Sequence, residues 1–194
     1  FGSTVDFQAF AGSKVDALSI DNVVKHAGSA SLKVTVPAPG DASGGYAGGA
    51  FVAGTARDLT GYNALTFWAK ASVAVTLNVA GLGNDNTGTS IHTAERNAIA
   101  LTTTWTKYSI AIPLASKLSA EKGLFFFAEG AEGATGYNIW FDDIKFENLT
   151  TVTNVRPSLA DATVNEEVGG SKTITGTTVT VNVDGVDQTV SAMP

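Results

Sequence analysis

The chain has 194 residues, of which 44% are hydrophobic and 15% are charged, and its formal net charge is −6. It contains no cysteine, which excludes disulfide bonds, thiolate nucleophiles and cysteine-ligated metals. The acidic balance argues against nucleic acid or an anionic membrane as a partner, and no apolar run reaches the roughly 20 residues of a membrane-spanning helix. We therefore expect no nucleic-acid partner and no membrane insertion.

Apolar and polar residues alternate along most of the first 146 residues with the period of two that predicts half-buried β-strands. In chain order, the predicted strands are 5–10, 31–36, 45–52, 64–70, 75–82, 107–112, 123–129 and 138–146. Turn-forming clusters such as 37–45 and 81–88 separate them, and only 115–122 could form a helical turn. The number and spacing of the strands predict an all-β fold, a jelly-roll β-sandwich of two antiparallel sheets.

Every aromatic residue lies between Phe1 and Phe146, so the rest of the chain has little with which to build a core. We therefore predict a β-sandwich domain over residues 1–149, a linker over 150–172 and a β-rich tail over 173–194. In the tail, Val179, Val181 and Val183 alternate with polar residues before an Asp-Gly turn, which predicts a hairpin.

A two-stranded hairpin is marginally stable in water, so the tail needs a partner. Three interpretations are open. The tail begins a further domain, folds back on its own body, or adds its strand to a neighbouring subunit through the three valines.

Five segments of the body occur in a familiar order. They are Val5-Asp-Phe-Gln8, His26-Ala-Gly-Ser-Ala-Ser-Leu-Lys-Val34, Asp58-Leu-Thr-Gly-Tyr-Asn-Ala-Leu-Thr-Phe-Trp-Ala-Lys70, Thr104-Trp-Thr-Lys-Tyr-Ser-Ile-Ala-Ile-Pro113 and Asn138-Ile-Trp-Phe-Asp-Asp-Ile-Lys-Phe146. Together they resemble the jelly-roll carbohydrate-binding modules of secreted polysaccharide-degrading enzymes. The resemblance covers about residues 5–149 and implies an extracellular, non-catalytic domain that binds polysaccharide on its concave sheet.

The resemblance also implies a structural calcium ion. Carried over by position, its ligands would be Gln8, the backbone near residues 27–29, and Asp142 or Asp143. The family usually has glutamate where this chain has Gln8, and the loss of that charge would weaken the site. The alternative is that the two aspartates accept hydrogen bonds at the end of a strand.

The resembling modules bind their ligand on the concave sheet. In this chain, the resemblance implies that the concave sheet contains strands 45–52, 75–82 and 123–129. Tyr46 is flanked by glycines, which let a flat ligand approach its ring. On 123–129, either Phe125, Phe127 and Glu129 face outward, or Phe126 alone does. The candidate ligand-binding residues are Tyr46, Trp68, Asn78, His92, Arg96, Phe125, Phe127 and Glu129.

Catalysis is not expected. A glycosidase needs two carboxyl groups about 5–9.5 Å apart across a cleft. Glu129 and Glu132 flank a glycine-marked turn, whereas the adjacent Asp142 and Asp143 would point to opposite faces of a regular strand.

Two functions therefore remain open. One is a carbohydrate-binding module. The other is a structural subunit of an extracellular filament or surface layer, in which each tail strand is donated to the next copy.

Overall fold

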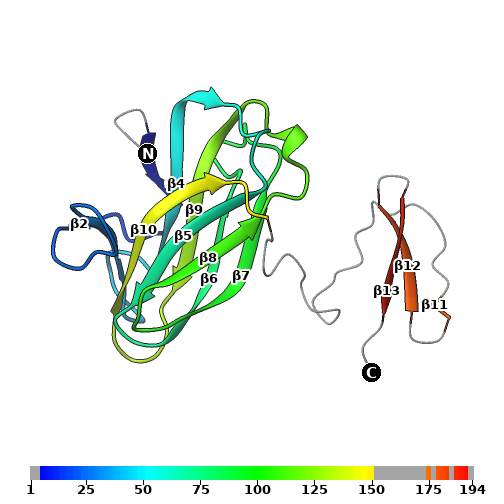
Figure 1. Ribbon diagram of the computed structural model, residues 1–194. Coiled ribbons are helices and arrows are strands. Elements are labelled where there is room, and N and C mark those ends of the chain that lie inside the picture. The colour runs from blue at the N-terminus through cyan, green and yellow to red at the C-terminus, as the bar shows by residue number, and fades with distance from the viewer. Residues whose placement is uncertain (1–4, 151–173, 176–177, 184–185, 192–194) are drawn as a thin grey trace. The chain divides into compact units, whose positions relative to one another are not determined.

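The computed structural model describes residues 5–150 and the tail strands at 174–175, 178–183 and 186–191 (Figure 1). The chain forms two units, Phe1–Thr153 and Asn154–Pro194. Within the described residues there is no helix that is both long and apolar enough to cross a membrane.

Two five-stranded sheets face each other in the first unit. Sheet A has the order β1(Val5–Ala9), β4(Tyr46–Arg57), β9(Glu121–Gly130), β6(Val75–Leu82) and β7(Ala94–Leu101). Sheet B has the order β2(Leu18–Asp21), β3(Ser31–Val36), β10(Tyr137–Glu147), β5(Ala64–Ala71) and β8(Thr106–Ala111). All of these strands pair antiparallel, which confirms the predicted sandwich. The possible helical turn is a single 3₁₀ turn, η1(Ala115–Lys117).

The main core lies between the sheets and is rich in phenylalanine. Phe67, Phe125, Phe127 and Phe141 are fully buried, and the Phe125 ring lies 5.4 Å from Phe141 and 5.6 Å from Phe67, centroid to centroid. Large aromatic side chains contribute most of the area that such a core removes from water. The aromatic residues of the body therefore contribute most of the packing that holds the two sheets together.

Strands β2 and β7 are absent from the sequence prediction. Within β7, Ala98 has a φ of 52°, a left-handed conformation that is uncommon for residues other than glycine. It interrupts the alternation: Ile99 is buried, whereas Asn97 and Ala98 are exposed. An irregular strand of this kind does not show a simple period of two.

The second unit contains a three-stranded antiparallel sheet in the order β11(Ile174–Thr175), β12(Thr178–Val183) and β13(Val186–Ser191). Val179, Val181 and Val183 pair with Val190, Gln188 and Val186 of β13, which is the pairing of the predicted hairpin. The linker 150–172 lies almost entirely outside the described residues. That these valines also pair with another subunit stays a prediction.

Candidate functional site

One row of residues runs across four neighbouring strands of sheet A. Gly48 of β4 pairs with Ala128 of β9, and Val79 of β6 pairs both with Ala128 and with Asn97 of β7. Cross-strand partners share a face. Because neighbouring strands lie about 4.8 Å apart, the row is about 14 Å long.

The row lies on the outer face of sheet A. Phe126, two residues before Ala128, belongs to a small apolar cluster with Ala50 and Val52 that is separate from the main core. Residues two apart on a strand share a face, so Ala128 and its partners face away from the core. We call this row, together with Tyr46 and Asn78 beside it, the platform.

Tyr46 closes one end of the platform. Its ring lies over Gly48, where an added Cβ would be 3.0 Å from Tyr46 Cε2. The phenol donates a hydrogen bond to the backbone oxygen of Ala11 at 3.0 Å. The contact with Gly48 and the hydrogen bond to Ala11 therefore fix the orientation of this half-buried ring.

Asn78 is exposed, and a buried carboxyl group fixes the backbone around it. Its Oδ1 accepts a hydrogen bond from Gly130 N–H at 2.6 Å, and its own N–H donates to Glu129 Oε2 at 2.7 Å. Glu129 is fully buried and also accepts a hydrogen bond from the Tyr137 hydroxyl. Burial raises the pKa of Glu129, although the hydrogen bonds from Tyr137 and Asn78 oppose this shift. Glu129 therefore positions Asn78, and the prediction that it contacts ligand is wrong.

Residues 83–93 cross the rest of this outer face, and we call them the cross-sheet loop. The backbone of Asn84 lies directly over Gly123 of β9, where an added Cβ would be 2.6 Å away. Further along, Asn86 Nδ2 donates to the backbone oxygen of Ala9 on β1 at 3.2 Å. The loop thus reaches from β6 to the far edge of the sheet, over the outer apolar cluster.

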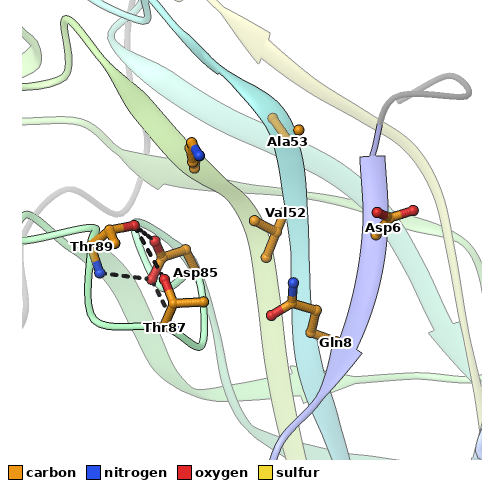
Figure 2. A pocket seen from close by; sticks show the side chains of 9 residues that line it. Asp6, Gln8, Val52, Ala53, Asp85, Thr87 and Thr89 are labelled. Carbon is orange, nitrogen blue, oxygen red and sulfur yellow. Dashed lines mark hydrogen bonds between the residues drawn. The ribbon is translucent and has the colours of Figure 1, made fainter.

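A pocket of about 230 Å³ lies between this loop and the strands (Figure 2). It is lined by Asp6, Gln8, Val52, Ala53, Gly54, Asp85, Thr87, Thr89 and Lys122. Asp85 is buried but accepts hydrogen bonds from the backbone N–H groups of Thr87, Thr89 and Ser90 at 3.1–3.2 Å. Burial favours the neutral acid, but these hydrogen bonds outweigh it and hold the pKa of Asp85 below its ordinary value.

Two predicted ligand contacts belong to the core. Phe125 and Phe127 are fully buried between the sheets, so the prediction that they meet a ligand is wrong. Register explains the error, because Phe127 pairs with Gly49 and Ala80, whereas Phe126 pairs with Ala50 of the outer cluster. The alternative pattern, with Phe126 alone facing outward, is the observed one.

Trp68 lies on the outer face of sheet B and not on sheet A. It pairs with Asp142 and Lys107, and its ring stacks on His26 with centroids 3.8 Å apart and planes 14° apart. The Trp105 ring contacts the edge of the same histidine at 5.9 Å. Trp68 therefore does not belong to the platform, and its contact with a ligand stays a prediction.

His92 and Arg96, two further candidate ligand-binding residues, lie on different elements. Arg96 lies in β7 and pairs with Ala80, a residue of the main core, so it has the opposite orientation to the platform row. His92 is half-buried in the cross-sheet loop, with its carbonyl against Gly83. Ligand contacts by Arg96 and by His92 stay predictions.

The predicted calcium ligands are not assembled. Gln8 pairs with Ala50 on the outer face of sheet A, whereas Asp142 and Asp143 lie at a bulge of β10 in sheet B. Asp142 Oδ2 accepts hydrogen bonds from the N–H groups of His26 and Ala27, at 2.8 and 3.1 Å. Asp142 Oδ1 accepts one from Asp143 N–H at 2.7 Å.

Asp143 contacts two basic side chains. It lies 3.2 Å from both His26 Nδ1 and Lys145 Nζ. Burial alone would raise the pKa of Asp143, but Lys145 and His26 lower it overall. The described residues contain no group of three or more His, Cys, Asp or Glu side chains placed to hold a metal. The predicted ligand set therefore does not fit calcium here, and calcium binding itself stays a prediction.

Comparisons with known proteins agree with this architecture. The family of carbohydrate binding domain 30 matches residues 3–148. A crystal structure of a family 30 carbohydrate-binding module is 19% identical, with a TM-score of 0.50, over 76% of this chain and 93% of that one. The family 11 module of the cellulosomal cellulase Lic26A-Cel5E of Clostridium thermocellum is 14% identical, with a TM-score of 0.50, over 77% and 90%.

No curated protein matches the sequence. The solved structures support the fold alone, which is the predicted jelly roll. The family match spans three quarters of the sequence and nearly all of the sandwich unit. The chain therefore belongs to the carbohydrate-binding domain 30 family.

Proposed function

We propose that the protein is a non-catalytic, extracellular module that binds polysaccharide on the platform of sheet A, the sheet that we expected to be concave. The row of Gly48, Ala128 and Val79 carries the proposal, because it is apolar and presents the half-buried Ala128 and Val79 beside the Tyr46 ring that lies over Gly48. Sugar rings pack their C–H faces on such apolar rows and on aromatic rings such as Tyr46. Amide groups such as those of Asn78 and Asn97, both exposed, hydrogen-bond to sugar hydroxyls.

One observation supports a binding role without cleavage, and a second supports an extracellular location. The carboxyl group nearest the platform, Glu129, is fully buried and holds Asn78. Glu95 on β7 is exposed and accepts a hydrogen bond from Asn97 Nδ2 at 3.4 Å. A glycosidase needs two accessible carboxyl groups that face each other across a cleft, and the buried Glu129 cannot be one of them. The family 11 structure comes from a cellulosomal cellulase, and the polymers that such enzymes attack lie outside the cell, which supports an extracellular location.

Affinity electrophoresis in gels that contain β-glucan, xylan or mannan tests the proposal. We expect the full chain to be retarded by at least one polymer, and Tyr46→Ala to bind at least about tenfold more weakly, because it loses the ring that ends the platform. Tyr62→Ala is the matched control, since Tyr62 is an exposed tyrosine whose ring packs on Phe146 at 5.9 Å, outside the platform. The proposal fails if no polymer retards the wild type, or if both variants lose affinity equally.

A second candidate function rests on the tail sheet. Strand β13 pairs with β12, and no described strand pairs with its other edge. Open edges accept strands from other chains. We propose, as the alternative, that tail sheets join copies of the chain into a filament or surface layer. Sedimentation of the full chain against a chain ending at Asn148 tests this, and equal assembly of the two would exclude it.

A further inference from the structure

The pocket beside the cross-sheet loop is separate from the platform. Its floor residue Val52 lies four residues beyond Gly48 on β4, about 13 Å along the strand. Between the two, Asn86 binds the backbone of Ala9, which pairs with Gly49. The loop thus divides the outer face of sheet A into a platform and a pocket.

Three polar side chains that line this pocket have no partner among the described residues. Within the described part of the chain, the carboxylate of Asp6, the amide of Gln8 and the ammonium of Lys122 form no hydrogen bond or ion pair with another residue. The carboxylate of Asp85, by contrast, is saturated by the N–H groups of its own loop. The polar groups of β1 and β9 are therefore the ones available to a ligand. Figure 2 shows Gln8 and Val52 on neighbouring strands, opposite Asp85, Thr87 and Thr89 of the loop.

These groups match a sugar ring better than an ion. A hydroxyl group both donates and accepts, and here it would meet an acceptor in Asp6, a donor in Lys122 and both in Gln8. Val52 and Ala53 provide an apolar surface for the C–H face of the ring. Asp6 and Asp85 together outnumber the single lysine, so the local charge disfavours acidic sugars and phosphates.

The size of the pocket favours a single unit. Its volume of about 230 Å³ is below the roughly 300–1,000 Å³ of sites that enclose drug-sized ligands. An extended chain fits an open strip such as the platform, whereas a small pocket with a wall formed by the loop suits the end of a chain.

We propose that this pocket is a second carbohydrate site, which binds one neutral sugar unit at the end of a glycan chain, independently of the platform. The inference rests on the proposed function, since the ligand would belong to the same class of polysaccharide. Two sites on one module raise the effective affinity for a polymer that can occupy both.

Nuclear magnetic resonance titration of the full chain with cellobiose and with mannobiose tests this proposal. The side-chain amide of Gln8 reports the pocket, and that of Asn78 reports the platform. We expect a disaccharide to shift the Gln8 signal both in the wild type and in Tyr46→Ala. Asp6→Asn, an isosteric change of an exposed residue, should weaken this binding about five- to tenfold and change polysaccharide retardation by about twofold or less.

The outcomes separate the two proposals. If disaccharides shift Asn78 but not Gln8, the pocket site is excluded and the platform stands. If Tyr46→Ala abolishes the Gln8 shift, the sites are not independent and the inference is wrong. If glucuronic acid binds the pocket as well as a neutral disaccharide, the neutral specificity is wrong. If neither polymers nor disaccharides bind, the proposed function itself falls.

Discussion

The outer faces of the two sheets differ in how their aromatic residues are used. Sheet B carries Trp68 and Trp140 on its outer face, yet these rings are already engaged. Trp68 stacks on His26, whereas Trp140 donates its Nε1–H to Asp21 at 2.9 Å and lies under Lys70. Sheet A carries Phe126, which is buried in the outer apolar cluster, and a half-buried tyrosine among glycines and alanines. Beside them lie polar side chains that have no partner among the described residues. Accessible ring faces and unused hydrogen-bonding groups, and not the number of aromatic residues, distinguish a binding face from a packed one.

The comparison is tested most severely at Phe127, which we had predicted to bind ligand. Phe127→Ala should lower the free energy of unfolding by about 4 kcal/mol, because it leaves a cavity between the sheets. Urea denaturation measures the loss, and affinity per folded molecule should not change. A small loss of stability together with a large loss of affinity would show that Phe127 contacts the ligand after all.

Trp68 tests the opposite face. Trp68→Ala should lower the free energy of unfolding by about 2 kcal/mol, less than for a core aromatic because the side chain is half-buried. Retardation by polysaccharide should stay at the wild-type level. His26→Ala, which removes the stacking partner of Trp68 together with the contacts of His26 to Asp143 and Trp105 but leaves the Trp68 ring in place, is the control. Loss of binding in Trp68→Ala with normal stability would show that sheet B binds the ligand.

The burial of Glu129 in sheet A leads us to expect that the free energy of unfolding depends on pH. Burial raises the pKa of Glu129 above its ordinary value of 4.5, so the folded protein holds this proton more tightly than the unfolded chain does. The resulting stabilisation is fully present below about pH 4.5 and is lost as the pH rises through the folded-state pKa. Glu129→Gln keeps an acceptor for Asn78 N–H and should abolish this dependence.

The measurement is the difference in unfolding free energy between wild type and Glu129→Gln, from pH 4 to pH 8. Asp85 and Asp143 have lowered pKa values, so their contributions have the opposite sign and are lost as the pH falls. Both are present in the two proteins and cancel in the difference. A difference that does not vary with pH would mean that Glu129 is ionised in the fold.

The smallest effect is expected at the cross-sheet loop. Asn86→Ala removes the hydrogen bond to Ala9 and should cost about 1 kcal/mol or less. Amide hydrogen exchange over residues 83–93 should accelerate, whereas retardation by polysaccharide should not change. Unchanged exchange would show that the loop is held by its other contacts.

The strand pattern predicted most of the sandwich because alternation follows directly from burial of one face. The resemblance to jelly-roll modules, and not the strand pattern, placed β4, β6 and β9 together in one sheet, whereas parity placed Asn78 and Tyr46 on outward positions of it. Alternation could not orient Phe125-Phe-Phe127, since three apolar residues in a row fit either parity. The pairing of Phe126 with Ala50 shows which of the three rings faces outward.

The platform and the pocket had weaker signals in the sequence. Gly48, Ala128 and Val79 are residue types that also fill cores, and their common row depends on the register of separate strands. The sheet to which Trp68 belongs depends on pairing between β5 and β10, which are distant in sequence. Asp6 and Lys122 meet in the pocket for the same reason. In the sequence, Asp6 stands between the apolar Val5 and Phe7, and this alternation was the one sign that its side chain faces away from the core.

The division of aromatic residues has a spectroscopic consequence. Trp68 and Trp140 lie on sheet B, and Trp105 contacts the His26 that covers Trp68, so indole fluorescence reports the order of that half of the sandwich. Ligand binding would instead report sheet A, which is complete only when β1 and the loop 83–93 have met across a sequence separation of 77 residues. A folding intermediate with sheet B formed would therefore fluoresce like the native protein and yet bind no glycan.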